Sequence, residues 1–195
     1  MYTIDETLSR CPWHKGNTLA IAYHDTEWGT PLHGEKKHFE FLVLDAFQAG
    51  LSWNTILNKR ENFRKAFDEF NYEKIAKYNQ DKINALLSDA GIIRNKLKIE
   101  ATISNASAFI KIQEKFGSFD AYIWRFVDGS PIVGTYSNLK EIPPKTALSD
   151  KISKDLIQHG FRFVGSTIIY AYMQAAGLVN DHLVDCFRYE QLKNA

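Results

Sequence analysis

The two cysteines of this chain, Cys11 and Cys186, each have a histidine nearby in the sequence. His24 follows Cys11 in a segment too irregular to form one helix, whereas His182 precedes Cys186 by four residues. A spacing of four places two side chains on the same face of a helix. Two thiolates and two imidazoles complete a tetrahedral zinc site, which would join the N-terminal arm to the C-terminal helix. The alternative is two unrelated buried thiols and two ordinary histidines, because free cysteine often packs as a small hydrophobic residue.

Aromatic residues gather beside ionisable groups in the first third of the chain: Trp13, Tyr23, Trp28 and Trp53. If they line one pocket that also holds a carboxylate, the pocket would suit a flat, cationic base. The rings would stack on such a base and attract its charge. The alternative is that these residues belong to the core, which is the commoner place for tryptophan.

Asp45 interrupts the apolar stripe of a helix expected over residues 36–49. The apolar residues of this stripe recur at intervals of three and four, as one face of a helix requires. A carboxylate near an apolar face is costly unless it has partners or a function. Asp45 is therefore a candidate site residue, and the alternative is an aspartate at the solvent edge of the stripe.

The sequence around Gly91 predicts two helices joined by a tight turn. Gly91 can end the first helix, and the amides of Ile92, Ile93 and Arg94 would then face outward at the start of the second. Free amides at a helix N-terminus bind phosphate, and Arg94, Lys96 and Lys98 add positive charge. This pattern resembles a helix-hairpin-helix clamp on the DNA backbone, although Ile93 stands where a second glycine is usual. The alternative is an ordinary helical hairpin with a solvated basic face.

Helical periodicity dominates the rest of the chain. The first 34 residues are expected to form an ordered arm, largely without long helices, and only residues 131–135 show a weak strand pattern. The sequence therefore predicts an all-α fold with two helical lobes, an N-terminal and a C-terminal half, around a central cleft. Helices are expected over residues 36–49, 53–59, 60–68, 72–77, 80–88, 94–115, 118–126, 149–158, 162–177 and 180–188.

Composition sets the class of protein. A chain of 195 residues with 45% hydrophobic residues is sufficient for one domain with a packed core. The net charge of +1 is too small to hold the protein to nucleic acid by charge alone, so such contact must come from a local patch. The sequence has neither an apolar signal core nor a run long enough to span a bilayer. We therefore expect no membrane partner and a cytoplasmic location, where both thiols stay reduced.

Several stretches match one family in order along almost the whole chain. Among them are IAYHDTEWG (21–29), QAGLSW (48–53), DAGIIR (89–94), GFRFVGST (160–167) and MQAAGLVNDH (173–182). Shorter matches lie at residues 11–13 and 59–63. Together these motifs resemble 3-methyladenine DNA glycosylase I, a family of bacterial enzymes that repair alkylated DNA.

The resemblance implies a single domain with the helix-hairpin-helix glycosylase fold, whose N- and C-termini are joined by one structural zinc. Its ligands would be Cys11, His24, His182 and Cys186. Tyr23 and Trp53 would stack on the extruded base, with Trp13 and Trp28 nearby. Gly50 and Leu51 would face the gap that the flipped nucleotide leaves, and Gly91, Ile93 and Arg94 would contact the DNA backbone. Loss of zinc is expected to loosen the N-terminal arm without changing the base pocket.

Asp45 is the one departure from the family pattern at the site. The family reads the methylated base with a glutamate, and the aspartate is shorter by one methylene, about 1.5 Å. The implied activity is hydrolysis, by water, of the N-glycosidic bond of 3-methyladenine in duplex DNA, as the first step of base excision repair. The implied enzyme is a monomer that releases free 3-methyladenine. One alternative is a lesion-binding protein that the shorter carboxylate has weakened as a catalyst. Another is a zinc-bound helical module without a nucleic-acid role.

Overall fold

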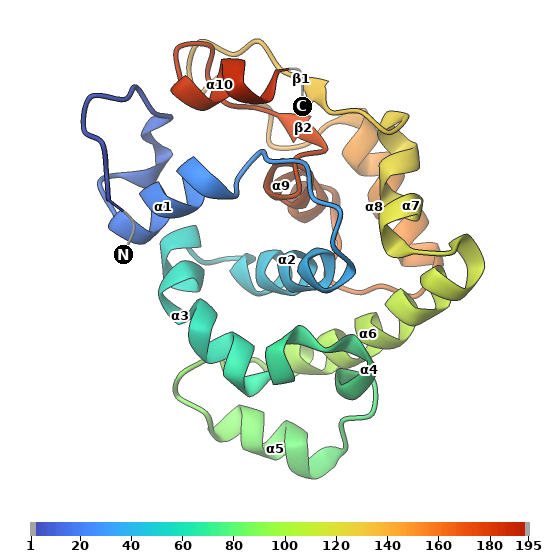
Figure 1. The fold of residues 1–195 in the computed structure, drawn as a ribbon. Helices are drawn as coiled ribbons and strands as arrows, with labels where there is room; N and C mark the ends of the chain where they lie inside the picture. The colour runs from blue at the N-terminus through green and yellow to red at the C-terminus, as the bar shows by residue number, and fades with distance from the viewer. Residues whose placement is uncertain (1–2, 194–195) are drawn as a thin grey trace.

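The computed structural model of the protein describes residues 3–193, and helices make up most of this range (Figure 1). The predicted all-α class is confirmed. The α-helices are α1 (Thr18–Thr26), α2 (Glu35–Gln48), α3 (Trp53–Ala66), α4 (Tyr72–Ile75), α5 (Gln80–Ser88), α6 (Lys96–Phe116), α7 (Phe119–Trp124), α8 (Ala147–Gln158), α9 (Ser166–Ala175) and α10 (Phe187–Leu192). Short 3-10 helices lie at η1 (Pro12–His14), η2 (Asp68–Phe70) and η3 (Arg125–Val127), and the strands are β1 (Ile132–Val133) and β2 (Val179–Asn180).

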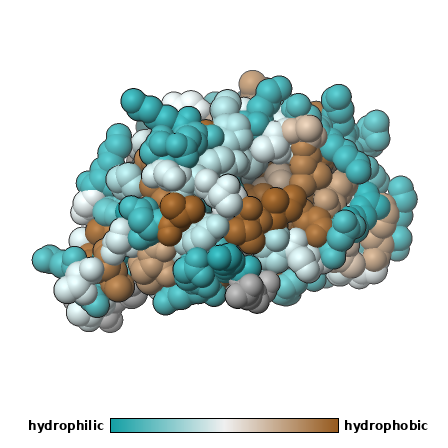
Figure 2. All heavy atoms as spheres, turned by 90° about the horizontal axis from the view of Figure 1, so that it is seen from above, coloured by the Kyte–Doolittle hydropathy of each residue, from teal (hydrophilic) through white to brown (hydrophobic). Residues whose placement is uncertain are grey.

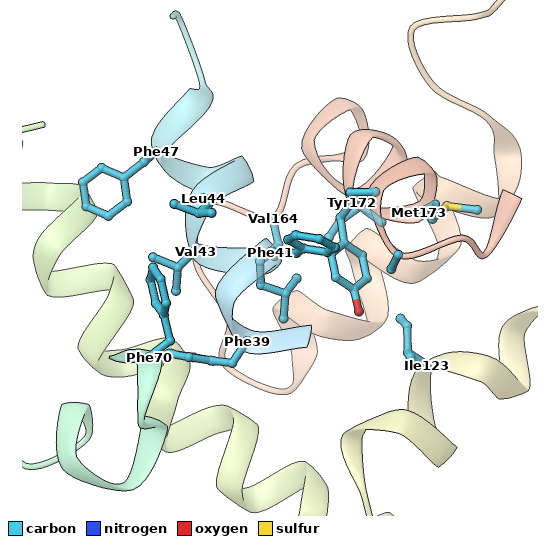
Figure 3. Close-up of a cluster of buried hydrophobic side chains, with 14 of the residues drawn as sticks. Phe39, Phe41, Val43, Leu44, Phe47, Phe70, Ile123, Val164, Tyr172 and Met173 are labelled. Atoms are coloured by element: carbon cyan, nitrogen blue, oxygen red, sulfur yellow. The ribbon is translucent and has the colours of Figure 1, made fainter. Parts of the chain in front are cut away.

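Helix α2 is the centre of the molecule. Every residue of this helix from His38 to Phe47 is buried, so it is packed on all sides and not along a single stripe. Figure 3 shows Phe39, Val43 and Phe47 on one side of α2, with Phe70 beside Phe39 and Val43, whereas Phe41 lies beside Tyr172 on the other side. Full burial of one such side chain stabilises the fold by roughly 1.5–3 kcal/mol. The packing fixes the orientation of α2, and therefore of the polar residues that it carries.

The sequence predicted one lobe from the N-terminal half of the chain and one from the C-terminal half, but the two lobes of the structure are divided differently. Helices α3 to α6 form the lobe below α2 in Figure 1, whereas α1, α9, α10 and both strands lie above it. The upper lobe therefore combines both ends of the chain. Strand β1 pairs in parallel with β2, and the amide of Phe187 donates to the carbonyl of Ser9 at 2.9 Å. These long-range backbone bonds leave no periodic signal in the sequence.

The C-terminal segment differs most from its predicted secondary structure. A helix was expected over residues 180–188, but Val179–Asn180 forms β2 and α10 begins only at Phe187. Asn180 is buried, and its amide donates to the carbonyl of Tyr189 at 3.1 Å, which stabilises the non-helical path. The helix expected over residues 162–177 also starts late, at Ser166, because Phe163 adopts a φ of 55°. The two helices expected over residues 53–68 are one continuous helix up to Ala66, since no turn residue separates them.

The face of the molecule seen in Figure 2, above α10 and the strands, is mostly hydrophilic, with hydrophobic residues gathered across its middle. No helix within residues 3–193 is long and apolar enough to cross a membrane.

Candidate functional site

The four predicted metal ligands meet in one buried cluster (Cys11, His24, His182, Cys186). Their candidate ligand atoms all lie within 4.8 Å of one another. The Nδ1 atom of His182 is 3.6 Å from the sulfur of Cys11 and 3.4 Å from that of Cys186. Tetrahedral zinc with ordinary bond lengths would hold sulfur and nitrogen ligands about 3.5 Å apart. The cluster therefore fits a tetrahedral metal ion. His182 and Cys186 converge from a loop and a helix N-cap, not from one helix face as expected.

Both histidines of the cluster are oriented by a second hydrogen bond from the nitrogen that faces away from the metal position. His24 donates from Nδ1 to Asp25 at 2.7 Å, and Asp25 in turn is bonded by the guanidinium of Arg10. His182 donates from Nε2 to the backbone carbonyl of Trp28 at 3.0 Å. Such outer partners fix the tautomer and the ring orientation of metal-binding histidines. Asp25 therefore supports the cluster, and the metal position is tied directly to the backbone of Trp28.

The four predicted aromatic residues line one pocket of about 310 Å³ together with Asp45. Trp13 and Trp28 meet edge to face at 5.2 Å between ring centroids, and Tyr23 lies 5.3 Å from Trp53. Tyr23 and Trp28 are buried, whereas Trp13 and Trp53 are half-buried and their indole N–H groups have no partner within residues 3–193. The predicted pocket thus exists, and two of its rings also belong to the core.

Other residues that line this pocket were not predicted from the sequence: Gln48, Leu139, Ile142, Ala171, Gln174 and Ala175. Gln48 and Gln174 lie inside the family motifs at residues 48–53 and 173–182, so these motifs could have indicated that both residues line the pocket. Leu139 and Ile142 come from an irregular segment between β1 and α8, which carries no periodic pattern.

Asp45 is the one carboxylate among the described residues that line the pocket. Its residue is 3% exposed, and its Oδ2 atom has no hydrogen-bond partner within residues 3–193. Burial raises the pKa of Asp45 well above its ordinary value. Burial, followed by the negative potential of Asp45, also raises the pKa of Tyr23, which keeps that hydroxyl neutral. The pocket therefore contains a carboxyl oxygen of Asp45 that has no hydrogen-bond partner within residues 3–193 and is surrounded by aromatic side chains.

The neighbouring acid Glu27 is engaged elsewhere. Its two oxygens accept from the guanidinium of Arg60 at 2.7 Å each, and Lys37 pairs with it at 2.8 Å. Although burial opposes ionisation, the bonds from Arg60 and Lys37 lower the pKa of Glu27 to about 2. Glu27 is therefore a charged member of an ionic network that joins α1, α2 and α3, and Asp45 is left as the carboxylate able to meet a ligand.

A short loop between α2 and α3 carries Gly50 and Leu51 beside the pocket. Gly50 has a φ of 81°, a conformation that favours glycine and allows the chain to reverse direction. The backbone amide of Leu51 donates to the backbone carbonyl of Gln48 at 2.7 Å, and the side-chain amide of Gln48 donates to the carbonyl of Leu51 at 3.0 Å. Leu51 is 38% exposed at the tip of this loop. Ser52 caps α3 by accepting from the amide of Thr55 at 3.2 Å.

The predicted hairpin is formed by α5 and α6, and the turn between them contains Gly91, Ile93 and Arg94. The backbone amides of Ile93 and Arg94 donate to no acceptor within residues 3–193, whereas the amide of Ile92, also predicted to be free, donates to the carbonyl of Asp89 at 3.4 Å. Arg94 is exposed, and Ile93 is half-buried against the core. A glycine that ends a helix commonly has a positive φ, but Gly91 does not. An added Cβ would lie 2.9 Å from Oδ1 of Asp89 and 3.3 Å from the side chain of Asn62, so a larger residue would have to displace these side chains.

Lys98 was expected to add positive charge for phosphate binding at this hairpin, and that expectation was wrong because its side chain is directed into the protein. Its residue is 7% exposed, and its ammonium group bonds to backbone carbonyls at the end of α2.

Comparisons with known proteins agree with this geometry. The family model described as methyladenine glycosylase matches residues 13–189. The chain is 47% identical over 182 residues to DNA-3-methyladenine glycosylase 1 of Escherichia coli, covering 93% of this chain and 97% of that protein. It is 44% identical over 178 residues to DNA-3-methyladenine glycosylase of Haemophilus influenzae, covering 91% and 96%.

Solved structures show the same likeness. A tyrosine-to-phenylalanine variant of 3-methyladenine DNA glycosylase I in complex with 3-methyladenine superposes with a TM-score of 0.90 at 34% sequence identity, covering 92% of this chain and 97% of that one. With the pocket, the hairpin and the metal cluster in place, the sequence and structural matches establish that this chain belongs to the methyladenine glycosylase family.

Proposed function

We propose that this protein is a DNA repair glycosylase that hydrolyses the N-glycosidic bond of 3-methyladenine in alkylated duplex DNA and releases the free base. The observation that carries the proposal is Asp45, a buried carboxyl group without a partner in an aromatic pocket. A buried unpaired acceptor is costly, and a ligand that supplies N–H donors and positive charge removes that cost. An adenine alkylated at N3 within DNA is cationic and carries such donors.

The pocket would act on a base that has been flipped out of the duplex. Tyr23 and Trp53 would stack on the base, with Trp13 and Trp28 at its edges. Asp45 would accept from the exocyclic amine or a ring N–H. In the empty pocket burial favours the protonated carboxyl, and the arrival of a cation favours the carboxylate. The alkylated base is already a good leaving group, so holding it extruded while water attacks the sugar carbon supplies much of the catalysis.

Two elements would hold the DNA. The exposed Leu51, carried by the turn at Gly50, would enter the space that the flipped nucleotide leaves. The free amides of Ile93 and Arg94, with the side chain of Arg94, would bind phosphate without reading sequence. Gly91 would keep the turn of the hairpin compact.

We further propose that the ion held by Cys11, His24, His182 and Cys186 is zinc. Two thiols and two imidazoles are a common donor set for structural zinc, and four protein ligands leave no open position. Zinc would therefore cross-link the ends of the chain and take no part in bond cleavage. No lysine is among the described residues that line the pocket, which supports hydrolysis by water over a Schiff-base lyase reaction. We propose a single domain that acts as a monomer in the cytoplasm.

The deciding experiment is release of free 3-methyladenine from methylated duplex DNA, measured by chromatography beside duplex binding. The proposed function predicts enzyme-dependent release by the parent protein, at a rate that falls in Asp45→Asn. Binding of lesion-containing duplex without release would instead identify a lesion-binding protein weakened by the shorter carboxylate. Absence of both at low salt would overturn a nucleic-acid role altogether.

A further inference from the structure

Lys98 is a buried cation whose partners are backbone carbonyls. It stands in the first turn of α6, the second helix of the hairpin, and its ammonium group donates to the carbonyls of Phe47 at 2.9 Å and Ala49 at 2.7 Å. Within residues 3–193 no carboxylate forms an ion pair with it. A buried charge without a counter-ion is costly. A methionine would fill the same volume as Lys98, but it could not donate hydrogen bonds to these carbonyls.

The carbonyls that Lys98 holds lie at the point where α2 ends. The last carbonyls of a helix have no partner within that helix, and a cation near this end is favourable. Immediately beyond Ala49 the chain turns at Gly50 and presents Leu51 to solvent. Lys98 thus fixes the origin of the Leu51 loop from a helix that belongs to the hairpin.

A second contact runs in the opposite direction, from the helix after the loop to the turn of the hairpin. Lys59 of α3 donates to the carbonyls of Ala90 and Gly91, each at 3.1 Å. The side-chain amide of Asn62 also donates to the carbonyl of Gly91, at 3.3 Å. Lys98 of the hairpin therefore bonds to the backbone just before the Leu51 loop, and side chains of α3, the helix after that loop, bond to the backbone of the hairpin turn.

We propose that Lys98 is a positioning residue that holds the Leu51 loop in register with the hairpin, so that anchoring the DNA backbone places Leu51 against the flipped-out site. This inference rests on the proposed function. Duplex DNA has a fixed distance between a phosphate and the neighbouring base stack, so a wedge is productive only when its distance from the backbone clamp is also fixed. Lys98 is too buried to contact the DNA itself.

The test compares Lys98→Met with Lys98→Arg and with Lys111→Met, a control at an exposed position about 20 Å further along α6. In single-turnover assays Lys98→Met should excise 3-methyladenine about tenfold or more slowly, whereas free-base affinity and duplex affinity stay within about threefold. Lys98→Arg keeps the charge and the donors and should recover part of the rate. Lys111→Met should match the parent. A normal excision rate in folded Lys98→Met would overturn the proposal.

A double-mutant cycle with Leu51→Ala separates positioning from general stability. If Lys98 acts through Leu51, then Lys98→Met should slow excision by less than about twofold once Leu51 is already alanine. A full additional loss in that background would show that Lys98 acts elsewhere, and would contradict the proposal.

Hydrogen exchange in the absence of DNA makes the test independent of the reaction. The amide of Leu51, which bonds to the carbonyl of Gln48, should exchange at least about tenfold faster in Lys98→Met, while amides in the middle of α6 keep their protection. Unchanged exchange at Leu51 would overturn the proposal. If the parent protein released no base, the proposed function would fail, and this measurement would still decide whether Lys98 holds the loop.

Discussion

Asp45 is the one carboxyl group among the described residues that line the pocket. Two substitutions distinguish the effect of its charge from the effect of its side-chain length. Asp45→Asn keeps the shape but loses the anionic acceptor, so free-base affinity and excision should fall by about 10- to 150-fold, the range for a hydrogen bond to a charged group. Asp45→Glu restores the family's longer reach and should retain or raise both. Calorimetry with 3-methyladenine and single-turnover excision measure the two quantities. If Asp45→Asn excised at the parental rate, the reading carboxylate would have to be sought elsewhere.

The same carboxyl should also impose a pH dependence on stability. Below about pH 4 it is protonated in both the folded and the unfolded chain and has no effect. As the pH rises, the unfolded chain ionises first, because burial holds the folded pKa higher, and the free energy of unfolding decreases. Asp45→Asn removes this loss of stability with rising pH. The Tm of the variant minus the Tm of the parent should therefore be larger at pH 7 than at pH 4. A Tm difference that stays constant between these pH values would show that Asp45 is not strained by burial.

Trp53 should contribute by stacking on the base. Base–aromatic stacking is typically worth about 1–3 kcal/mol, so Trp53→Ala should weaken free 3-methyladenine binding by roughly 5- to 150-fold. Trp53→Phe keeps a ring and should lose much less, which makes it the matched control. Equal affinity in a folded alanine variant would assign Trp53 to the core alone.

At the scale of elements, the hairpin should bind DNA without choosing the lesion. Gly91→Val would bring a side chain against Asp89 and Asn62 and displace the turn that carries the free amides. Affinity for every duplex should fall by about tenfold, the cost of a lost charge-assisted bond, while free-base affinity stays unchanged. Fluorescence anisotropy with damaged and undamaged duplexes makes the comparison. A change confined to the damaged duplex would place Gly91 in base recognition instead.

Elements set by local signals were predictable from the sequence, and those set by distant contacts were not. Helix α5 has the predicted bounds, because Asn79 caps it by accepting from the amide of Lys82 and its apolar residues repeat regularly. The pairing of β1 with β2 joins segments far apart in the chain, so residues near His182 were wrongly predicted as helix. The four candidate metal ligands could still be named and do lie together, because the rarity of cysteine in the sequence was a signal that did not depend on the backbone conformation.

At the scale of the whole molecule, the four candidate metal ligands are joined to the segments that carry the pocket, and we now expect loss of a bound metal to change the pocket as well. Trp13 follows Cys11 by two residues, Tyr23 precedes His24, and the carbonyl of Trp28 accepts from His182. Cys186→Ser should therefore lower the metal content, the Tm and the free-base affinity together. Elemental analysis, thermal unfolding and calorimetry report the three quantities. Parental base affinity in a metal-depleted, folded variant would restore the original expectation.

The joining of both ends of the chain also has a consequence for synthesis on the ribosome. The lobe of helices α3 to α6 uses one continuous stretch of chain, so all of its residues leave the ribosome before those of α9 and α10. The pocket cannot form at that stage, because its early residues are held by late ones. The amide of Gly29 donates to the carbonyl of Gln174, the amide of Leu32 to that of Ala176, and His24 lies against Cys186. A nascent or interrupted chain would therefore lack a complete pocket, and under the proposed function it could not excise a base before translation has passed Cys186.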